Sequence, residues 1–211
     1  MNDPLLKRLR ARRMWVAAKY RFRRYVYRDG GPTTQWQRVV MNRRIADHVS
    51  GLHPESCEAI EISGRTHAGY PWKSYLASEF RHLDICDPPA SVPQYDVVLC
   101  EQVLEHVADP WRAVETLYDL CRPGGAVVVS TPFLIRVHPT PLDCWRFTED
   151  GLRRLLEGRG FVVDKTDSWG NKRCVHGNLR RFPPMAPWRS LRNDPLFPLQ
   201  VWAFAHRPEL S

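Results

Sequence analysis

Two histidines and the charged residues near them are the side chains of this sequence best suited to move a proton. His106 directly follows Glu105, and His138 begins a segment that also holds Asp143 and Arg146. Histidine titrates near neutral pH, so it can deprotonate a hydroxyl group or orient a polar ligand. Asp143 and Arg146 also allow a simpler interpretation, in which they pair with each other and hold the shape of their loop. Both interpretations stay open at this point.

A second set of candidates comes at the ends of two short apolar runs. It comprises Glu61, Ile62, Ser63 and Gly64 at one run, and Glu101 and Gln102 at the other. A glycine lets the backbone turn close to a bound molecule. Carboxylate and amide oxygens accept hydrogen bonds. These residues are therefore candidates for ligand binding.

Alternating strands and helices must position these residues. Apolar runs predict strands at 59–62, 95–100 and 126–130, from 161, and at 199–204. Helical spacing and capping residues predict helices over about 33–49, from Asp109-Pro110 to 121, and from Thr148 to 158. The Pro- and Arg-rich segment 171–198 is expected to be irregular. Such a chain predicts an α/β fold with a mainly parallel sheet, whose ligand crevice lies beyond the carboxyl ends of the strands.

Positive charge is concentrated at the start of the chain. Residues 1–28 carry ten Lys and Arg and one Asp, while the remainder holds 21 basic and 22 acidic residues. We predict a basic helical arm over residues 1–32 and a single domain over 33–211, divided at the breaker cluster that ends with Pro32. The arm could contact an anionic surface, or pack on the domain or on a second subunit.

The composition also bears on the cellular setting. No apolar run approaches the roughly 18 residues of a membrane-spanning helix, and the first residues lack the apolar region of a secretion signal. The six cysteines form no CxxC pair, which predicts free thiols and not a zinc site. We expect a cytoplasmic protein that could associate with the periphery of a membrane.

Two motifs resemble those of class I S-adenosylmethionine-dependent methyltransferases, in particular type 11-like members. Residues 95–98 and 101–110 are similar to the family segment "fDvV…evLEHv.dP", and residues 122–132 are similar to "LkPGG.l.istP". The resemblance covers roughly residues 57–206. It implies a Rossmann-like methyltransferase sheet and S-adenosylmethionine as the cofactor.

The resemblance also implies roles for the strand-end residues. Glu61 would lie near the methionine ammonium and Gly64 against the cofactor backbone, with Ile62, Ser63, Glu101 and Gln102 as further cofactor contacts. The family usually has an acidic residue followed by G-x-G, whereas the next glycine after Gly64 is Gly69.

The chain is also short for the family between Gly64 and Asp96. The sheet must therefore be shortened between its first and fourth strands, with at least one helix reduced or missing. This makes the acid that binds the ribose hydroxyls hard to place. Asp84 and Glu79 are the candidates, and we favour Asp84 for contact with the cofactor.

Residues 138–148 resemble a segment, "H..p.DywRfT", of members that act on sugars, lipids or natural products. We expect it to cover the methyl-transfer site, with His138 as the general base, His106 as the second choice, and Asp143 and Arg146 orienting the acceptor. Ubiquinone-pathway and small-RNA O-methyltransferases bind a divalent cation through E-x-x-E-H and a later histidine. Here Gln102 occupies the first position, followed by Glu105 and His106, with His138 as a possible later ligand. Because an amide is a weaker ligand than a carboxylate, we predict no metal.

The leading hypothesis is O-methylation of a small-molecule, sugar or natural-product acceptor, with N-methylation as a variant. A nucleic-acid methyltransferase guided by the arm is the alternative. We do not expect a nucleic-acid partner, because the chain past residue 28 has no basic excess and no N-P-P-Y or N-P-P-F motif. A further alternative is a non-catalytic, methyltransferase-like partner subunit, suggested by the incomplete glycine motif.

Overall fold

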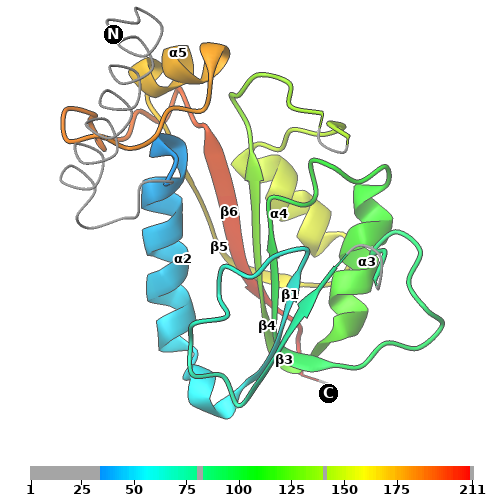
Figure 1. The fold of residues 1–211 in the computed structure, drawn as a ribbon. Coiled ribbons are helices and arrows are strands. Elements are labelled where there is room, and N and C mark those ends of the chain that lie inside the picture. Colours follow the sequence, from blue (N-terminus) through cyan, green and yellow to red (C-terminus); the bar gives the residue numbers. More distant parts are fainter. Residues whose placement is uncertain (1–33, 80–82, 140–141, 210–211) are drawn as a thin grey trace, which may run out of the picture.

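The computed structural model describes residues 34–79, 83–139 and 142–209, so the predicted arm over residues 1–32 lies outside the described part (Figure 1). Within that part a single sheet has the strand order β2-β1-β3-β4-β6-β5. Its strands are β1 (Glu58–Ile62), β2 (Ser74–Ser78), β3 (Tyr95–Glu101), β4 (Cys121–Pro132), β5 (Val162–Trp169) and β6 (Gln200–His206). The first four run parallel, and β6 is antiparallel to both β4 and β5. This confirms the α/β, Rossmann-like prediction.

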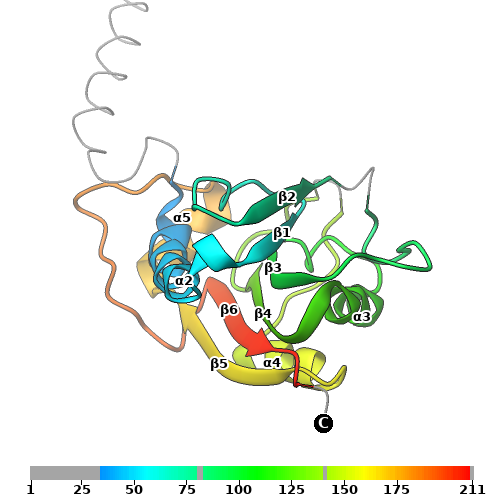
Figure 2. The same ribbon diagram turned by 90° about the horizontal axis from the view of Figure 1, so that it is seen from below.

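Helices cover both faces of the sheet (Figures 1 and 2). They are α2 (Val39–Gly51), α3 (Pro110–Leu120), α4 (Glu149–Glu157) and α5 (Lys172–Arg180), with short 3-10 turns η1 (Trp36–Arg38) and η2 (Pro54–Ser56). The predicted caps are present: the Asp109 side chain accepts from the backbone N–H of Arg112, and the Thr148 hydroxyl accepts from that of Gly151. Capping satisfies N–H groups that a helix start leaves without partners.

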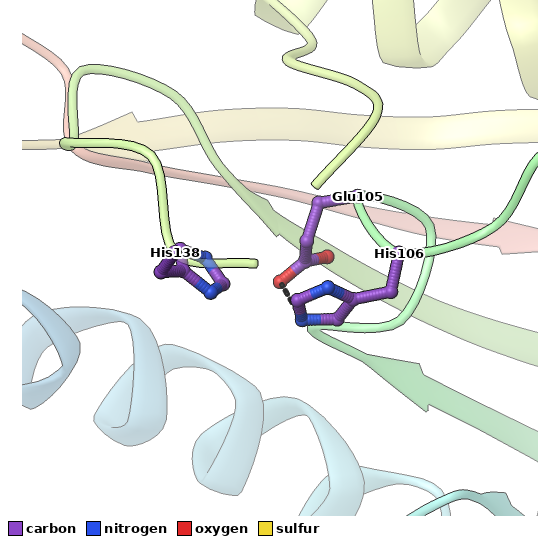
Figure 3. A group of neighbouring side chains, drawn as sticks. All are labelled: Glu105, His106 and His138. Atoms are coloured by element: carbon purple, nitrogen blue, oxygen red, sulfur yellow. Dashed lines mark ion pairs between the residues drawn. The ribbon is translucent and has the colours of Figure 1, made fainter. Parts of the chain in front are cut away.

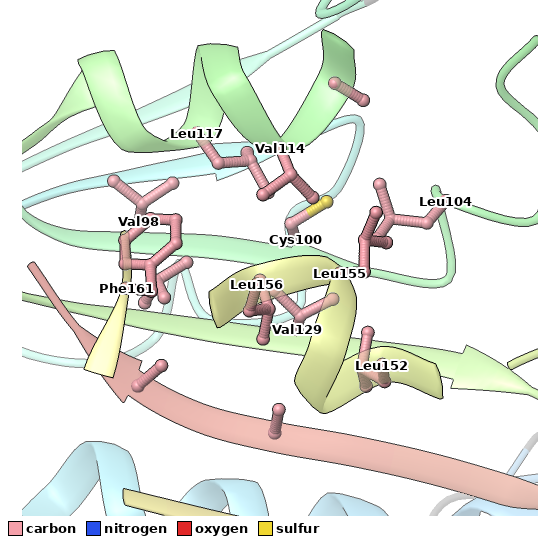
Figure 4. Packing of buried hydrophobic residues seen from close by; sticks show 14 of the residues in the cluster. Val98, Cys100, Leu104, Val114, Leu117, Val129, Leu152, Leu155, Leu156 and Phe161 are labelled. Atoms are coloured by element: carbon pink, nitrogen blue, oxygen red, sulfur yellow. The ribbon is translucent and has the colours of Figure 1, made fainter. Parts of the chain in front are cut away.

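Two hydrophobic cores hold the layers together. On one face α3 and α4 pack against β3 and β4, through residues such as Leu117, Leu152 and Val129 (Figure 4). On the other face α2 contributes Met41 and Ile45 to a core that also contains aromatic residues from β5 and β6. Fully burying one such side chain contributes about 1.5–3 kcal/mol. The strand ends are thus anchored from both sides.

The predicted shortening lies between β1 and β3, where β2 is the single strand among the described residues. In place of a first crossover helix, residues 63–73 form a compact loop. The Trp72 indole N–H donates to the His67 carbonyl at 2.8 Å, and the Tyr70 hydroxyl donates to the Ala46 carbonyl of α2 at 3.4 Å. The sequence pattern did not predict β2, because this strand is mostly exposed and has serine at both ends.

The expectation that segment 171–198 is irregular was wrong for its first part. Helix α5 begins where the Asn171 side chain accepts from the Cys174 N–H at 2.9 Å. Its buried positions are Cys174 and Asn178, so it has no stripe of large apolar residues for a periodicity search to detect. Across the described ranges, no helix combines the length and apolar character needed to cross a membrane.

Candidate active site

A cavity of about 950 Å³ opens at the carboxyl ends of β1, β2 and β3. Its wall includes five of the residues predicted to contact a cofactor: Ile62, Ser63, Gly64, Asp84 and Gln102. The far end is formed by His106, Val107, Ala108 and Leu142. The segments that follow β1 and β3 therefore share one cavity, and Leu142 belongs to the segment expected to cover the methyl-transfer site.

Glu61 is buried behind this wall. Its carboxylate accepts from the backbone N–H groups of Thr66 (2.7 Å) and His67 (2.9 Å) and from the Tyr75 hydroxyl (2.6 Å). The carboxylate thereby fixes the loop that follows β1. A Cβ at Gly64 would overlap this carboxylate, so only glycine fits there without displacing it.

Ser63 explains how the loop turns without the usual first glycine. It adopts a left-handed φ of 54°, a conformation that costs a non-glycine residue about 1–2 kcal/mol. The backbone therefore follows a glycine-type turn although serine occupies the position.

The end of β3 is held in a similar way. The Glu101 carboxylate bonds to the ring of buried His67 and is not part of the cavity wall. Gln102 does line the cavity and is also left-handed, with a φ of 57°. Its backbone N–H donates to the Ser130 carbonyl at 2.8 Å, and its side-chain amide donates to the Ser130 hydroxyl at 3.3 Å.

The sequence analysis missed Arg38, at the end of η1. Its guanidinium donates to the Gln102 side-chain oxygen at 3.1 Å, and its Nε is buried with no partner among the described residues. Burial lowers the pKa of Arg38, while the nearby carboxylates of Glu101 and Glu105 oppose that shift. Its place before the first strand gives no sequence signal for this contact, because tertiary packing alone brings Arg38 to Gln102.

Beyond Gln102, the structure brings together Glu105, His106 and His138, each of which places one side-chain nitrogen or oxygen within 4.8 Å of the other two (Figure 3). Glu105 is 1% exposed, with one oxygen 3.7 Å from His106 Nε2 and the other without a partner in the described structure. Burial raises the pKa of Glu105 to about 7. From the sequence, Glu105 was considered as part of the family motif and as a possible metal ligand, and its burial was not predicted.

The hydrogen bonding of His106 indicates which of its ring nitrogens carries the hydrogen. Its Nδ1 bonds to the Leu142 carbonyl, which can only accept, so Nδ1 carries the hydrogen. In the neutral ring Nε2 is then a free proton acceptor. His106 lies in the cavity wall, whereas His138 does not line the cavity and packs edge-on against the His106 ring at 5.0 Å between centroids.

His138 sits on a loop that Asp143 and Arg146 hold in shape. The two side chains form a bidentate ion pair, and the Asp143 carboxylate also accepts from the His138 backbone N–H at 2.7 Å. The bond from Arg146 holds the pKa of Asp143 at about 2. Burial lowers the pKa of His138, which favours its neutral form. The pairing interpretation of Asp143 and Arg146 is thus confirmed.

Both candidates for the ribose acid lie at the cavity. Glu79 directly follows β2, and Asp84 lies in the turn after residues 80–82. One Asp84 oxygen accepts from the Cys86 N–H at 2.8 Å, which shapes this turn. The cavity wall therefore includes two carboxylates as well as His106.

The residues present do not fit the four-ligand metal site of E-x-x-E-H relatives. Gln102, at the first position, directs its amide to Arg38 and Ser130. Arg38 also places a fixed positive charge close enough to Glu105 and His138 to affect their pKa values. A divalent cation would have to bind beside this charge with a single carboxylate, an arrangement that disfavours a metal.

Comparison with known proteins supplies the family. A family model described as a methyltransferase domain matches residues 42–166. A Mycolicibacterium smegmatis protein named "Probable S-adenosylmethionine-dependent methyltransferase" is 36% identical over 162 residues, 68% of this chain and 60% of that protein. A ubiquinone biosynthesis O-methyltransferase of Dinoroseobacter shibae is 33% identical over 44% of this chain and 45% of that enzyme. This chain thus spans less than two thirds of the length of either relative.

Solved structures agree on the fold. An S-adenosylmethionine-dependent methyltransferase from Clostridium acetobutylicum superposes with a TM-score of 0.53 at 6% identity, covering 82% of this chain and 96% of that one. At this identity the likeness concerns the fold alone. The domain model, which matches more than half of the chain, establishes that this chain belongs to the S-adenosylmethionine-dependent methyltransferase family, in agreement with the Mycolicibacterium smegmatis relative.

Proposed function

We propose that this protein transfers the methyl group of S-adenosylmethionine to a hydroxyl group of a small-molecule or glycan acceptor, with His106 as the proton acceptor. One observation carries the proposal: Gly64 and His106 face the same cavity. A cofactor bound along this wall would bring an activated methyl group toward the histidine.

The wall of the cavity fits the parts of the cofactor. The carboxylates of Glu79 and Asp84 suit the two ribose hydroxyls, which can donate to carboxylate oxygens. Gly64 permits close approach of the backbone. The cation of Arg38, next to Gln102, suits the carboxylate of the methionine part. When bound, the cofactor supplies a methyl group already activated by a sulfonium.

The acceptor side provides a base and a group that stabilises its charged form. Nε2 of His106 can take the proton of an acceptor hydroxyl as oxygen attacks the methyl carbon. Glu105, 3.7 Å from that nitrogen, would stabilise the imidazolium once ionised. Asp143 and Arg146 fix the loop on which His138 supports the His106 ring.

The Dinoroseobacter relative is named as an O-methyltransferase, which supports the choice of oxygen as the acceptor atom. An amine acceptor would depend less on the base, because a neutral amine is already nucleophilic.

We also propose that residues 1–32 form a separable arm, so that a chain beginning at Thr33 melts cooperatively.

The test is incubation of the full chain with methyl-labelled S-adenosylmethionine and a fractionated extract of the source cell. We expect label in one fraction, in a product whose methyl group is stable to base as an ether. Label in nucleic acid, or in no fraction although the chain binds the cofactor, would contradict the proposal and favour a nucleic-acid enzyme or a non-catalytic subunit respectively.

A further inference from the structure

The charge of the described domain is strongly uneven, although its basic and acidic residues nearly balance in number. Segment 170–193 contains six Lys and Arg and no Asp or Glu. The acidic excess therefore lies in the rest of the domain. Helix α5 begins this basic segment and lies at the end of the sheet where β4 ends and the 133–146 loop begins (Figure 1).

The basic side chains around α5 are available to a partner. Lys172, Arg173 and Arg192 line a shallow hollow of about 550 Å³ at the start of the helix, where they outnumber the one acid of its wall, Asp194. At its other end, the Arg136 guanidinium donates to the Arg180 carbonyl at 3.1 Å, which ties the loop after β4 to α5. No ion pair involves any of these five basic side chains within the part of the chain that is described.

Exposed aliphatic side chains lie among these cations. Leu179 is 60% exposed and Val137 is 72% exposed, and both line a second hollow of about 400 Å³ between α5 and the loop after β4. The Phe182 ring packs edge-on against His138 at 5.7 Å between centroids. This basic and apolar surface therefore borders the acceptor end of the active site. We call it the α5 face, comprising Arg136, Val137, Lys172, Arg173, Leu179, Arg180, Arg181 and Arg192.

We propose that the α5 face docks on an anionic lipid bilayer. Lysine and arginine attract anionic headgroups, and side chains such as leucine and valine lose their exposed area in the interfacial layer. A nucleic acid would neutralise the same cations but offers little to bury the aliphatic side chains. The acidic excess elsewhere in the domain would turn the remaining surface away from the membrane. Docking in this orientation brings the mouth of the active site toward the bilayer, and it does not depend on the reaction proposed above.

The test compares flotation of the full chain with vesicles of phosphatidylglycerol and phosphatidylcholine. One variant carries Arg173→Glu, Arg180→Glu and Arg181→Glu. Its matched control carries Arg43→Glu, Arg44→Glu and Arg154→Glu, three exposed arginines on α2 and α4 with the same change in net charge. Both variants keep residues 1–33, so the difference in their vesicle binding reports the contribution of the α5 face. If the Glu variant does not melt cooperatively, a variant with Arg173→Gln, Arg180→Gln and Arg181→Gln replaces it.

We expect the α5 variant to lose about a hundredfold in vesicle partitioning, since each basic residue near the surface contributes roughly fivefold. The control should lose much less. Leu179→Ser should weaken partitioning severalfold without changing its salt dependence, whereas phosphatidylcholine vesicles should bind every variant poorly. Equal losses in variant and control would overturn the proposal. So would a loss of affinity for a single-stranded RNA oligonucleotide with vesicle binding unchanged, which would identify a nucleic-acid surface.

Discussion

The two halves of the cavity differ in how completely their buried carboxylates are hydrogen-bonded. In the cofactor half (residues 61–67 and 101–102), Glu61 has three donors and Glu101 bonds to His67. In the acceptor half (residues 105–106 and 138–146), one oxygen of buried Glu105 has no partner in the described structure. The carboxylates of the cofactor half are thus fixed by partners within the protein, although His67 Nδ1 is buried without a partner in the described structure, whereas Glu105 retains an oxygen that a substrate can complete. Unpaired buried polar groups are costly, so their retention points to function.

The largest expected effect is on catalysis in the acceptor half. His106→Asn should lower the single-turnover rate by about a hundred- to ten-thousand-fold, the usual range for loss of a general base. Affinity for S-adenosylhomocysteine should stay nearly unchanged, because the cofactor half is intact. On the same variant, rapid-quench assays measure the single-turnover rate and calorimetry measures the affinity for S-adenosylhomocysteine.

Two further histidines sharpen this prediction. His138→Asn should reduce the rate less than His106→Asn, because His138 acts through the His106 ring. His176→Asn, on exposed α5, serves as the control and should leave the rate unchanged. A larger loss at His138 than at His106 would make His138 the base, as the sequence alone suggested.

The next effect concerns stability and pH. Because burial raises the pKa of Glu105 to about 7, the folded chain holds a proton there that the unfolded chain releases near its ordinary value of 4.5. Glu105 therefore lowers the free energy of unfolding as pH rises from about 4.5 to about 7. Glu105→Gln should stabilise the protein by on the order of 2 kcal/mol above pH 7, and not below pH 4.5.

Urea unfolding across this pH range measures the effect. Glu61→Gln is the comparison from the cofactor half, where an amide cannot accept all three bonds of the carboxylate. It should destabilise the protein at neutral pH. Stabilisation by both variants would show that the two halves do not differ as described.

A smaller effect is expected at the turn after β1. Ser63→Gly removes the cost of a left-handed serine, and the extra chain entropy of glycine offsets part of the gain, so we expect stabilisation of about 0.5–1 kcal/mol. Ala46→Gly, in the interior of α2, should have the opposite sign. Thermal melts of the two variants distinguish them, and destabilisation by both would contradict the strained-turn interpretation.

No effect is expected from metal removal. Since Arg38 already supplies positive charge beside Glu105, treatment with a chelator should leave methyl transfer unchanged. A loss of activity that manganese or zinc restores would instead assign Glu105, His106 and His138 to a metal.

The sequence predicted those parts of the fold that depend on local patterns. Apolar runs located β1, β3, β4 and β6, and the capping residues Asp109 and Thr148 fixed the helix starts. The exposed edge strand β2 and the polar helix α5 were missed, because neither has a continuous apolar run or stripe. The signal for α5 was its cap, Asn171.

The site was predictable where it follows a strand end and not where distant segments meet. Gly64 and Gln102 were found from their positions after apolar runs. Arg38 reaches Gln102 across 64 residues of sequence, and nothing local marks that contact. The importance of Glu105 comes from its burial, which depends on the 142–146 loop folding over it: its carbonyl accepts from the Cys144 N–H at 2.7 Å.

The central claim is that the cofactor binds in the preformed half of this cavity. Calorimetric titration with S-adenosylhomocysteine tests it on three proteins: the natural chain, Gly64→Ala and Gly69→Ala. A Cβ at Gly64 overlaps the Glu61 carboxylate, whereas a Cβ at Gly69 meets no atom within 4 Å. We predict saturable binding by the natural chain and by Gly69→Ala, and affinity at least about tenfold weaker for Gly64→Ala. No binding by the natural chain, or equal binding by all three, would contradict the account.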